Sequence, residues 1–215
     1  VFLAIPLILV MAMGQMMVII CRHVDISIGS ILAFAAITIG FVFIHYPNTS
    51  LLMALLITAS VGTIMGLVNG IIVTRFNVHS IIVTLGTLSL YRGLVFIVSG
   101  GRQIDRNDIP VHIISFSQTS FLFSIPAILI LSVIIVLITH LIMRHSVLGR
   151  EIYATGSNPE AAHLKGINVT KVTLFCFGVC GMLAGVAGLF YASRFGYVNP
   201  GVTGVGIEFI VIAGV

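Results

Sequence analysis

The chain has 215 residues, of which 59% are hydrophobic and only 7% are charged. Soluble domains carry roughly 25% charged residues, so a chain this poor in charge cannot cover a water-facing surface. Together with a mean hydropathy of +1.22, this composition excludes a soluble domain and predicts a polytopic membrane protein.

Apolar stretches predict membrane-spanning helices along the whole chain. A helix needs about 20 apolar residues to cross a bilayer, and unbroken hydrophobicity is typical of helices rather than of barrel strands. We expect an all-α transmembrane bundle. We also expect residues 1–215 to be a single transmembrane domain, truncated at both ends, with further spans outside it. The expected spans are 1–20, 28–44, 51–73, 81–98, 125–143 and 172–192, with a seventh starting near 205.

The first interruption is segment 22–30, Arg-His-Val-Asp-Ile-Ser-Ile-Gly-Ser. Asp25 can accept from backbone N–H groups at a helix start, with Ser27 nearby, and Gly29 permits close approach. Two interpretations stay open. The segment is a capped turn between two spans, or it is a broken helix whose polar groups face a translocation path.

Glycines recur at four-residue spacing in two of the expected spans. Small residues at this spacing allow helices to approach closely. We interpret these glycines as packing seams, within one subunit or between two, and the alternative is backbone that lines a substrate path. The residues are Gly62, Gly66, Gly70, Gly181 and Gly185.

Two charged residues lie within apolar sequence. Arg92 is two-thirds of the way through span 81–98, and a central arginine costs about 2.5–3.5 kcal/mol on insertion scales. Arg92 therefore points into the bundle or reaches back to the interface. Glu208 begins the last stretch and is either a helix cap, which we favour, or a group that lines the path.

Two long polar segments, 99–124 and 144–171, connect the spans. Basic residues favour the cytoplasmic side. Placing 144–171 in the cytoplasm puts more basic residues inside than outside. The inside set is Arg22, Arg75, Arg144, Arg150, Lys165 and Lys171, and the outside set is Arg102, Arg106 and Arg194.

Residues 158–166 carry the start and stop signals of a short helix. Asn158 is a good N-cap, Pro159 suits the first turn, Glu160 complements the helix dipole, and Gly166 can close the helix. So short a helix is unstable alone in water. It is either a link on the membrane surface or a helix that a partner binds through an apolar patch, formed by Ala161, Ala162 and Leu164.

The chain lacks the sequence patterns of an enzyme. It has no nucleophile elbow, no His-Glu-x-x-His and no Walker-type glycine loop. Cys21, Cys176 and Cys180 are too few and too apolar in setting for a disulfide framework or a metal site. We therefore expect no catalytic residue, no metal and no cofactor in this chain. Any ATP hydrolysis must occur in a separate subunit or outside residues 1–215, and we expect a separate partner subunit.

Several blocks resemble permease subunits of bacterial ABC importers. Glu160-Ala161-Ala162, followed after three residues by Gly166, is similar to their EAA…G signature, the coupling helix that docks on the ATPase. This resemblance implies an ATPase-coupling set, which comprises Gly149, Arg150, Asn158, Pro159, Glu160, Ala161, Ala162 and Gly166. Candidates for the translocation path are Asp25, Ser27, Arg92 and Glu208.

Other blocks resemble the ribose-type sugar permeases. They are Val24–Ser30, Thr84–Thr87 with Tyr91–Gly93, and Gly149–Gly156, and they cover most of the chain in the right order. Arg22-His23 departs from this group, in which glycines are usual. With residues 86–93, this feature looks most similar to the autoinducer-2 permeases of the Lsr type.

The resemblance implies a set of partners and a location. The partners are a second permease subunit in a homo- or heterodimer, two ABC ATPase subunits that bind ATP and Mg²⁺, a periplasmic substrate-binding protein and the lipid bilayer, without nucleic acid. The location is the bacterial inner membrane, and the cargo is autoinducer-2, ribose or a related monosaccharide. The alternatives are an amino-acid permease of the same superfamily and an ion-coupled transporter that uses Asp25 or Glu208.

Overall fold

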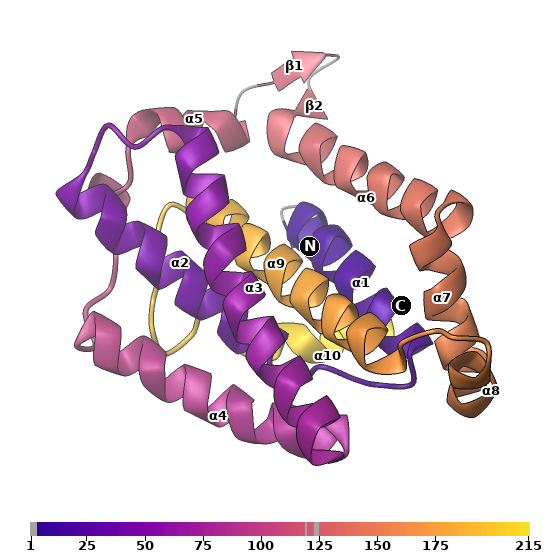
Figure 1. The fold of residues 1–215 in the computed structure, drawn as a ribbon. Coiled ribbons are helices and arrows are strands. Elements are labelled where there is room, and N and C mark those ends of the chain that lie inside the picture. The colour runs from indigo at the N-terminus through magenta and orange to yellow at the C-terminus, as the bar shows by residue number, and fades with distance from the viewer. Residues whose placement is uncertain (1–3, 119, 123–124) are drawn as a thin grey trace.

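The structure is a computed structural model that describes residues 4–118, 120–122 and 125–215. Figure 1 shows a bundle of helices with a small hairpin, β1–β2, outside it. The elements in chain order are α1 (Ile5–Ile20), α2 (Ile28–His45), α3 (Leu51–Phe76), α4 (Ser80–Ser99), η2 (Arg106–Asp108), α5 (Val111–Gln118), β1 (Ser120–Leu122), β2 (Ile125–Pro126), α6 (Ala127–His145), α7 (Val147–Ser157), α8 (Pro159–Leu164), α9 (Val169–Phe195) and α10 (Ile207–Ala213).

Five of the described helices, α2, α3, α4, α6 and α9, are long and apolar enough to cross a membrane, and α1 is a shorter apolar helix. The predicted all-α polytopic architecture is therefore confirmed. Residues 1–3 of the expected span 1–20 lie outside the described residues. α6 begins at Ala127 because Ile125 and Pro126 pair with β1 instead.

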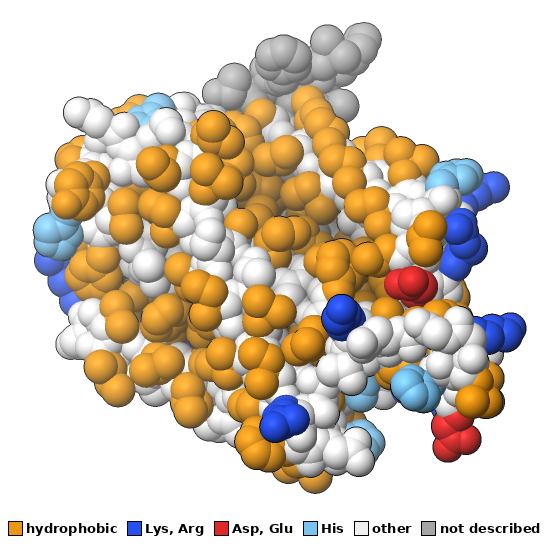
Figure 2. All heavy atoms as spheres, in the orientation of Figure 1, with side chains coloured by type: hydrophobic (Ala, Val, Ile, Leu, Met, Phe, Trp, Pro, Cys, Tyr) orange, Lys and Arg blue, Asp and Glu red, His pale blue; other side chains and the backbone are white. Residues whose placement is uncertain are grey.

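Helix α9 forms the centre of the bundle. Its apolar window is 78% buried, whereas the corresponding window of α6 is only 22% buried. α1, α2 and α3 all pack against α9, and α6 lies at the edge (Figure 1). Hydrophobic side chains are also spread over the whole face drawn in Figure 2, and many large ones are exposed. So many exposed apolar side chains suit contact with lipid or with another membrane helix rather than with water.

The five glycines of the expected seams lie where α3 crosses α9. A Cβ atom on Gly62 would overlap the carbonyl oxygen of Gly181, and one on Gly66 would overlap that of Phe177. Gly185 lies equally close to the carbonyl oxygen of Thr58, and Gly70 lies against the Phe177 side chain. The seam is thus within this chain, and any larger residue at its centre would separate the two helices.

The chain reverses direction between α1 and α2. Along α1, Gly14 lies against Cys180, and the Sγ atom of Cys21 lies 3.4 Å from that of Cys176, so α1 runs antiparallel to α9. The Asp25 end of α2 lies near Gln15, whereas Gly188 on α9 approaches Leu32. Segment 22–27 is therefore a turn between two helices. The interpretation as a break within one helix is wrong, because the helices on either side run in opposite directions.

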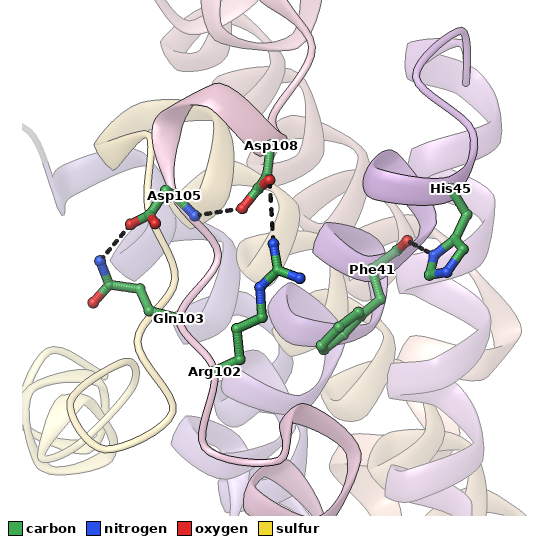
Figure 3. Close-up of polar contacts among 6 residues, drawn as sticks. All are labelled: Phe41, His45, Arg102, Gln103, Asp105 and Asp108. Atoms are coloured by element: carbon green, nitrogen blue, oxygen red, sulfur yellow. Dashed lines mark hydrogen bonds and ion pairs between the residues drawn. The ribbon is translucent and has the colours of Figure 1, made fainter.

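The polar segment after α4 folds at the opposite end of the bundle from α7. Arg102 forms an ion pair with Asp108 at 3.5 Å, and the Asp108 carboxylate also accepts from the backbone N–H of Asp105 at 3.0 Å (Figure 3). Arg194 donates to the carbonyl oxygen of Ser117 in α5. Arg22, in contrast, lies at the C-terminal end of α7. Basic residues therefore occur at both ends, as the polar segments predict.

Candidate functional site

A cluster of buried polar side chains lies beside the turn between α1 and α2. The Asp25 carboxylate is fully buried, and its Oδ1 atom accepts from the Ser27 backbone N–H at 2.9 Å and from the Ser27 hydroxyl at 2.7 Å. A buried carboxylate is costly unless hydrogen bonds replace its water. Local hydrogen bonds of this kind fold the turn at Asp25, so part of the site follows from two residues that are two positions apart in sequence.

Two residues of other helices complete this cluster. The side-chain amide of Asn69, in α3, donates to Asp25 Oδ2 at 3.2 Å and to the Ser27 hydroxyl oxygen at 2.8 Å. The hydroxyl group of Tyr91, in α4, donates to the carbonyl oxygen of Met65 at 2.9 Å and lies 3.2 Å from the amide oxygen of Asn69. We call Asp25, Ser27, Asn69 and Tyr91 the Asp25 cluster.

A fifth polar residue supports the backbone of the cluster. With its amide oriented to satisfy its neighbours, Gln15 of α1 pairs with both the N–H and the carbonyl group of Asp25, each at 3.2 Å. Gln15 and Asn69 are both fully buried. Neither residue was predicted from the sequence, although an amide within an apolar helix is a signal of a buried polar contact.

Arg92 and Glu208, the two other candidates for the path, meet the segment between α9 and α10. Arg92 is half-buried and donates from Nη1 to the carbonyl oxygen of Thr203 at 2.7 Å, so it points into the protein. Glu208 lies in the first turn of α10, and its carboxylate accepts from the Gly206 backbone N–H at 3.3 Å. Glu208 thus caps a helix start, the role we favour.

The same segment touches the start of α2. A Cβ atom on Gly29 would overlap both the Glu208 carboxylate and the carbonyl oxygen of Gly204, and one on Gly204 would overlap the carbonyl oxygen of Gly29. Residues 25–30, α4 and the segment before α10 therefore converge inside the bundle. Asp25 and Ser27 lie in one part of this region, and Arg92 and Glu208 lie in another, with Gly29 between them.

The helix expected at 158–166 is present as α8, Pro159–Leu164. The Asn158 side chain accepts from the Ala161 backbone N–H at 3.0 Å, as a helix N-cap does. At the other end Gly166 has φ of 83°, and its N–H bonds to the carbonyl oxygen of His163 while that of Ile167 bonds to Ala162. This pair of bonds is the Schellman motif, which stops a helix at a left-handed glycine.

The side chains of α8 differ from the expected apolar patch. Leu164 is 88% exposed and Ala161 is exposed, but Ala162 is only 3% exposed. The assignment of Ala162 to the exposed patch is therefore wrong, because that face of the helix packs inward. Beside α8 lies a groove of about 800 Å³, lined by residues that include Pro159, Glu160, Leu164 and Gly166.

Gly149 and Arg150, the remaining coupling candidates, lie in the first turns of α7. Gly149 is buried, and a Cβ atom there would overlap the carbonyl oxygen of Met143 at the end of α6. Its N–H bonds to the Ser146 side chain at 3.0 Å, which caps α7. Arg150 is exposed. Gly149 therefore shapes the corner between α6 and α7, and Arg150 alone of the pair is available to a partner.

Long apolar helices around α9, with short capped helices between them, define a multi-pass membrane protein. The chain belongs to the family described as "Branched-chain amino acid transport system / permease component", which it matches over residues 1–215. No solved structure matches the chain.

The chain is similar to curated proteins named "Autoinducer 2 import system permease protein LsrC". It is 34% identical over 213 residues to the protein of Yersinia pseudotuberculosis serotype O:3 (strain YPIII), and the matched region covers 99% of this chain and 59% of the relative. It is 35% identical over 213 residues to the protein of Yersinia enterocolitica serotype O:8, and this matched region covers 99% of this chain and 58% of the relative. The chain thus spans less than two thirds of these relatives.

Proposed function

We propose that this chain is the core of a permease subunit of an ATP-driven importer and that α8 is its coupling helix. This proposal rests on the length, the caps and the exposed face of α8. It is a short helix, capped at both ends by Asn158 and Gly166, with Leu164 88% exposed beside a groove. A helix of this length depends on tertiary contacts or a partner for its stability, and a docked ATPase would cover Leu164.

In this proposal the chain itself carries out no chemical step. ATP and Mg²⁺ bind to the partner ATPase, and its closure displaces α8 and α7. The bundle then changes between outward- and inward-facing arrangements, as transport by alternating access requires. Asp25, Ser27, Arg92 and Glu208 lie where helix ends and turns converge within the bundle, which supports their place beside the translocation path.

We propose a small, polar, sugar-like molecule as the cargo, with autoinducer-2 first among the candidates. The names of the similar permeases from Yersinia support this cargo. An amino acid is the second candidate, because the family is described by branched-chain amino acid transport. Uptake of labelled autoinducer-2, ribose and leucine by cells with and without the permease would separate these cargoes.

We also propose an orientation in the membrane, a location and a set of partners. Segment 144–171, with α7 and α8, lies in the cytoplasm, and the permease is part of the bacterial inner membrane. It pairs with itself or with a sister permease and receives its cargo from a periplasmic binding protein. The short helices at the two ends of the bundle support two distinct docking faces, with α5 and η2 at the face opposite to α7.

The coupling role is tested with the purified permease–ATPase complex. Glu160→Ala and Leu164→Ser remove exposed side chains of α8, and Ile138→Ala, on the exposed side of α6 and outside both docking faces, is the control. We expect both α8 variants to lose substrate-stimulated ATP hydrolysis and uptake, whereas the control retains them. Unchanged hydrolysis and uptake in both α8 variants would contradict the coupling role.

A further inference from the structure

The C-terminal end of α7 is held by an arginine from the turn between α1 and α2. Arg22 donates from Nε to the carbonyl oxygen of Gly156 and from Nη2 to that of Ser157, each at 2.5 Å. Both carbonyl groups belong to the last turn of α7, where no intrahelical partner exists. A planar guanidinium can donate to two acceptors at once, and its charge suits the negative end of the helix dipole.

The backbones of α1 and α7 touch at the same place. A Cβ atom on Gly156 would overlap the carbonyl oxygen of Ile20, so only glycine permits this contact. Arg22 follows Ile20 closely and has φ of 65°, a left-handed conformation that costs energy in any residue with a Cβ atom. The neighbouring Thr155 is 1% exposed, and its hydroxyl has no partner within the described part of the chain.

We call Ile20, Arg22, Thr155 and Gly156 the Arg22 junction. Backbone strain and an unpaired buried hydroxyl are both features that tend to be retained at moving or functional contacts. The two bonds of Arg22 to the end of α7 offset the left-handed conformation at this residue, but nothing in the described part of the chain pairs the Thr155 hydroxyl. The role of the junction in stability therefore does not explain the buried hydroxyl.

The junction lies between the Asp25 cluster and α8. Three residues lead from Arg22 to Asp25, at most about 10 Å of extended chain. Between them, the Val24 N–H donates to the Ser80 hydroxyl at 3.1 Å, and the Thr84 hydroxyl donates to the Val24 carbonyl oxygen at 3.3 Å. In the other direction, α8 begins at Pro159, directly after the last turn of α7.

We propose that Arg22 is a positioning residue, which makes the α7–α8 end and segment 22–27 move as one unit. A displacement of α8 then reaches the Asp25 cluster through two hydrogen bonds and one backbone contact. This inference rests on the proposed coupling role of α8. It assigns the transmission to a residue outside both the coupling helix and the path.

Hydrogen exchange tests the physical link without any transport assay. The full-length permease is measured in lipid nanodiscs as wild type, Arg22→Ala and Arg75→Ala, a control at an exposed arginine in the last turn of α3. We expect amides in 22–26 and 156–158 to exchange about 10-fold faster in Arg22→Ala, because the opening of this region becomes easier. Unchanged exchange in this variant would overturn the proposal.

A second experiment measures how much uptake each ATP hydrolysed drives in the assembled complex, and so tests whether Arg22 transmits the displacement of α8. Arg22→Gly removes the side chain and adopts the left-handed conformation freely, so it keeps the fold. We expect the amount of assembled complex to stay at the wild-type level while uptake per ATP hydrolysed falls about 10-fold, within the usual range of coupling between sites. Arg22→Lys keeps the charge but has a single ammonium group in place of the planar guanidinium. Its uptake per ATP hydrolysed should therefore lie between the values of the wild type and of Arg22→Gly.

The two proposals fail in different ways. A complex of Arg22→Gly with the wild-type ratio of uptake to hydrolysis would contradict the role of Arg22, and so would a loss of assembly with the ratio unchanged. A wild-type complex without ATP-driven uptake would instead refute the proposed function. The exchange experiment would still decide whether Arg22 links the two segments.

Discussion

The side-chain amide nitrogen of Asn69, on α3, donates to Oδ2 of the Asp25 carboxylate at 3.2 Å. This bond joins α3 to the turn between α1 and α2. Both side chains are fully buried. The residues are 44 positions apart in sequence, so this bond fixes the packing of distant segments. It also places a carboxylate inside the bundle with protein groups in place of water.

Asn69→Leu keeps the approximate side-chain volume and removes this donor. An unsatisfied buried polar group costs about 1–3 kcal/mol, and each 1 kcal/mol lowers the melting temperature of a chain this long by about 2–4 °C. We expect the melting temperature of Asn69→Leu in detergent to be about 5 °C lower than that of the wild type. The control is Thr74→Val on the same helix, which loses only the contacts of its hydroxyl with carbonyl oxygens of its own helix, those of Gly70 and Ile71. Equal melting temperatures for the two variants would show that Asn69 does not stabilise the turn.

The crossing of α3 and α9 predicts opposite effects of one substitution at two glycines. Gly66→Ala places a methyl group against the carbonyl oxygen of Phe177, whereas Gly86, in α4, has open space around its Cβ position. Alanine favours a helix over glycine by about 1 kcal/mol. Gly86→Ala should therefore keep or raise the melting temperature, and Gly66→Ala should lower it and reduce the yield of folded protein. A stable Gly66→Ala protein would mean that the helices cross elsewhere.

The segment before α10 offers a matched pair of glycines with the same backbone conformation. Gly204 and Gly206 have φ of 76° and 78°, so alanine is strained at both. Only at Gly204 would the added Cβ atom also overlap Gly29. We expect Gly204→Ala to abolish uptake and Gly206→Ala to reduce it partially. Similar uptake in the two variants would show that the contact between Gly204 and Gly29 is not needed for transport.

Loss of the N-cap of α8 should change the stability of that helix alone, and by less than the substitutions within the bundle. Asn158→Ala removes the bond to the Ala161 N–H, and loss of such a cap costs about 1 kcal/mol. Because α8 lies outside the core, the melting temperature of the bundle should stay unchanged while hydrogen exchange in 159–164 accelerates. Asn107→Ala is the control, in η2, whose Arg106 lies against Gly196 at the C-terminal end of α9. Protection of 159–164 that equals the wild type would contradict the capping role.

The long elements were predictable from the sequence because continuous hydrophobicity is a strong signal of a spanning helix. Helix α8 was predictable for another reason, since Asn158, Pro159 and Gly166 are local start and stop signals. Helices α5 and α7 were missed, because they are too short to give an apolar signal of spanning length and lie in polar segments.

The candidate site was predictable only in part. Asp25 and Ser27 form their bonds locally, and their spacing indicates this. Asn69, Gln15 and the Arg22 contact depend on which helices become neighbours, and no local pattern determines that arrangement. The inward side of Ala162 was missed for the same reason, since the short apolar pattern of α8 does not show which face packs on the protein.

In the proposed mechanism, ATP hydrolysis by a partner drives transport through this permease. The most direct measurement is uptake of labelled autoinducer-2 into proteoliposomes that contain the permease, its ATPase and its binding protein. We predict uptake that requires ATP on the side of α8 and persists when an ionophore removes ion gradients. Uptake that proceeds without ATP and stops with the ionophore would contradict the account, and it would identify an ion-coupled transporter instead.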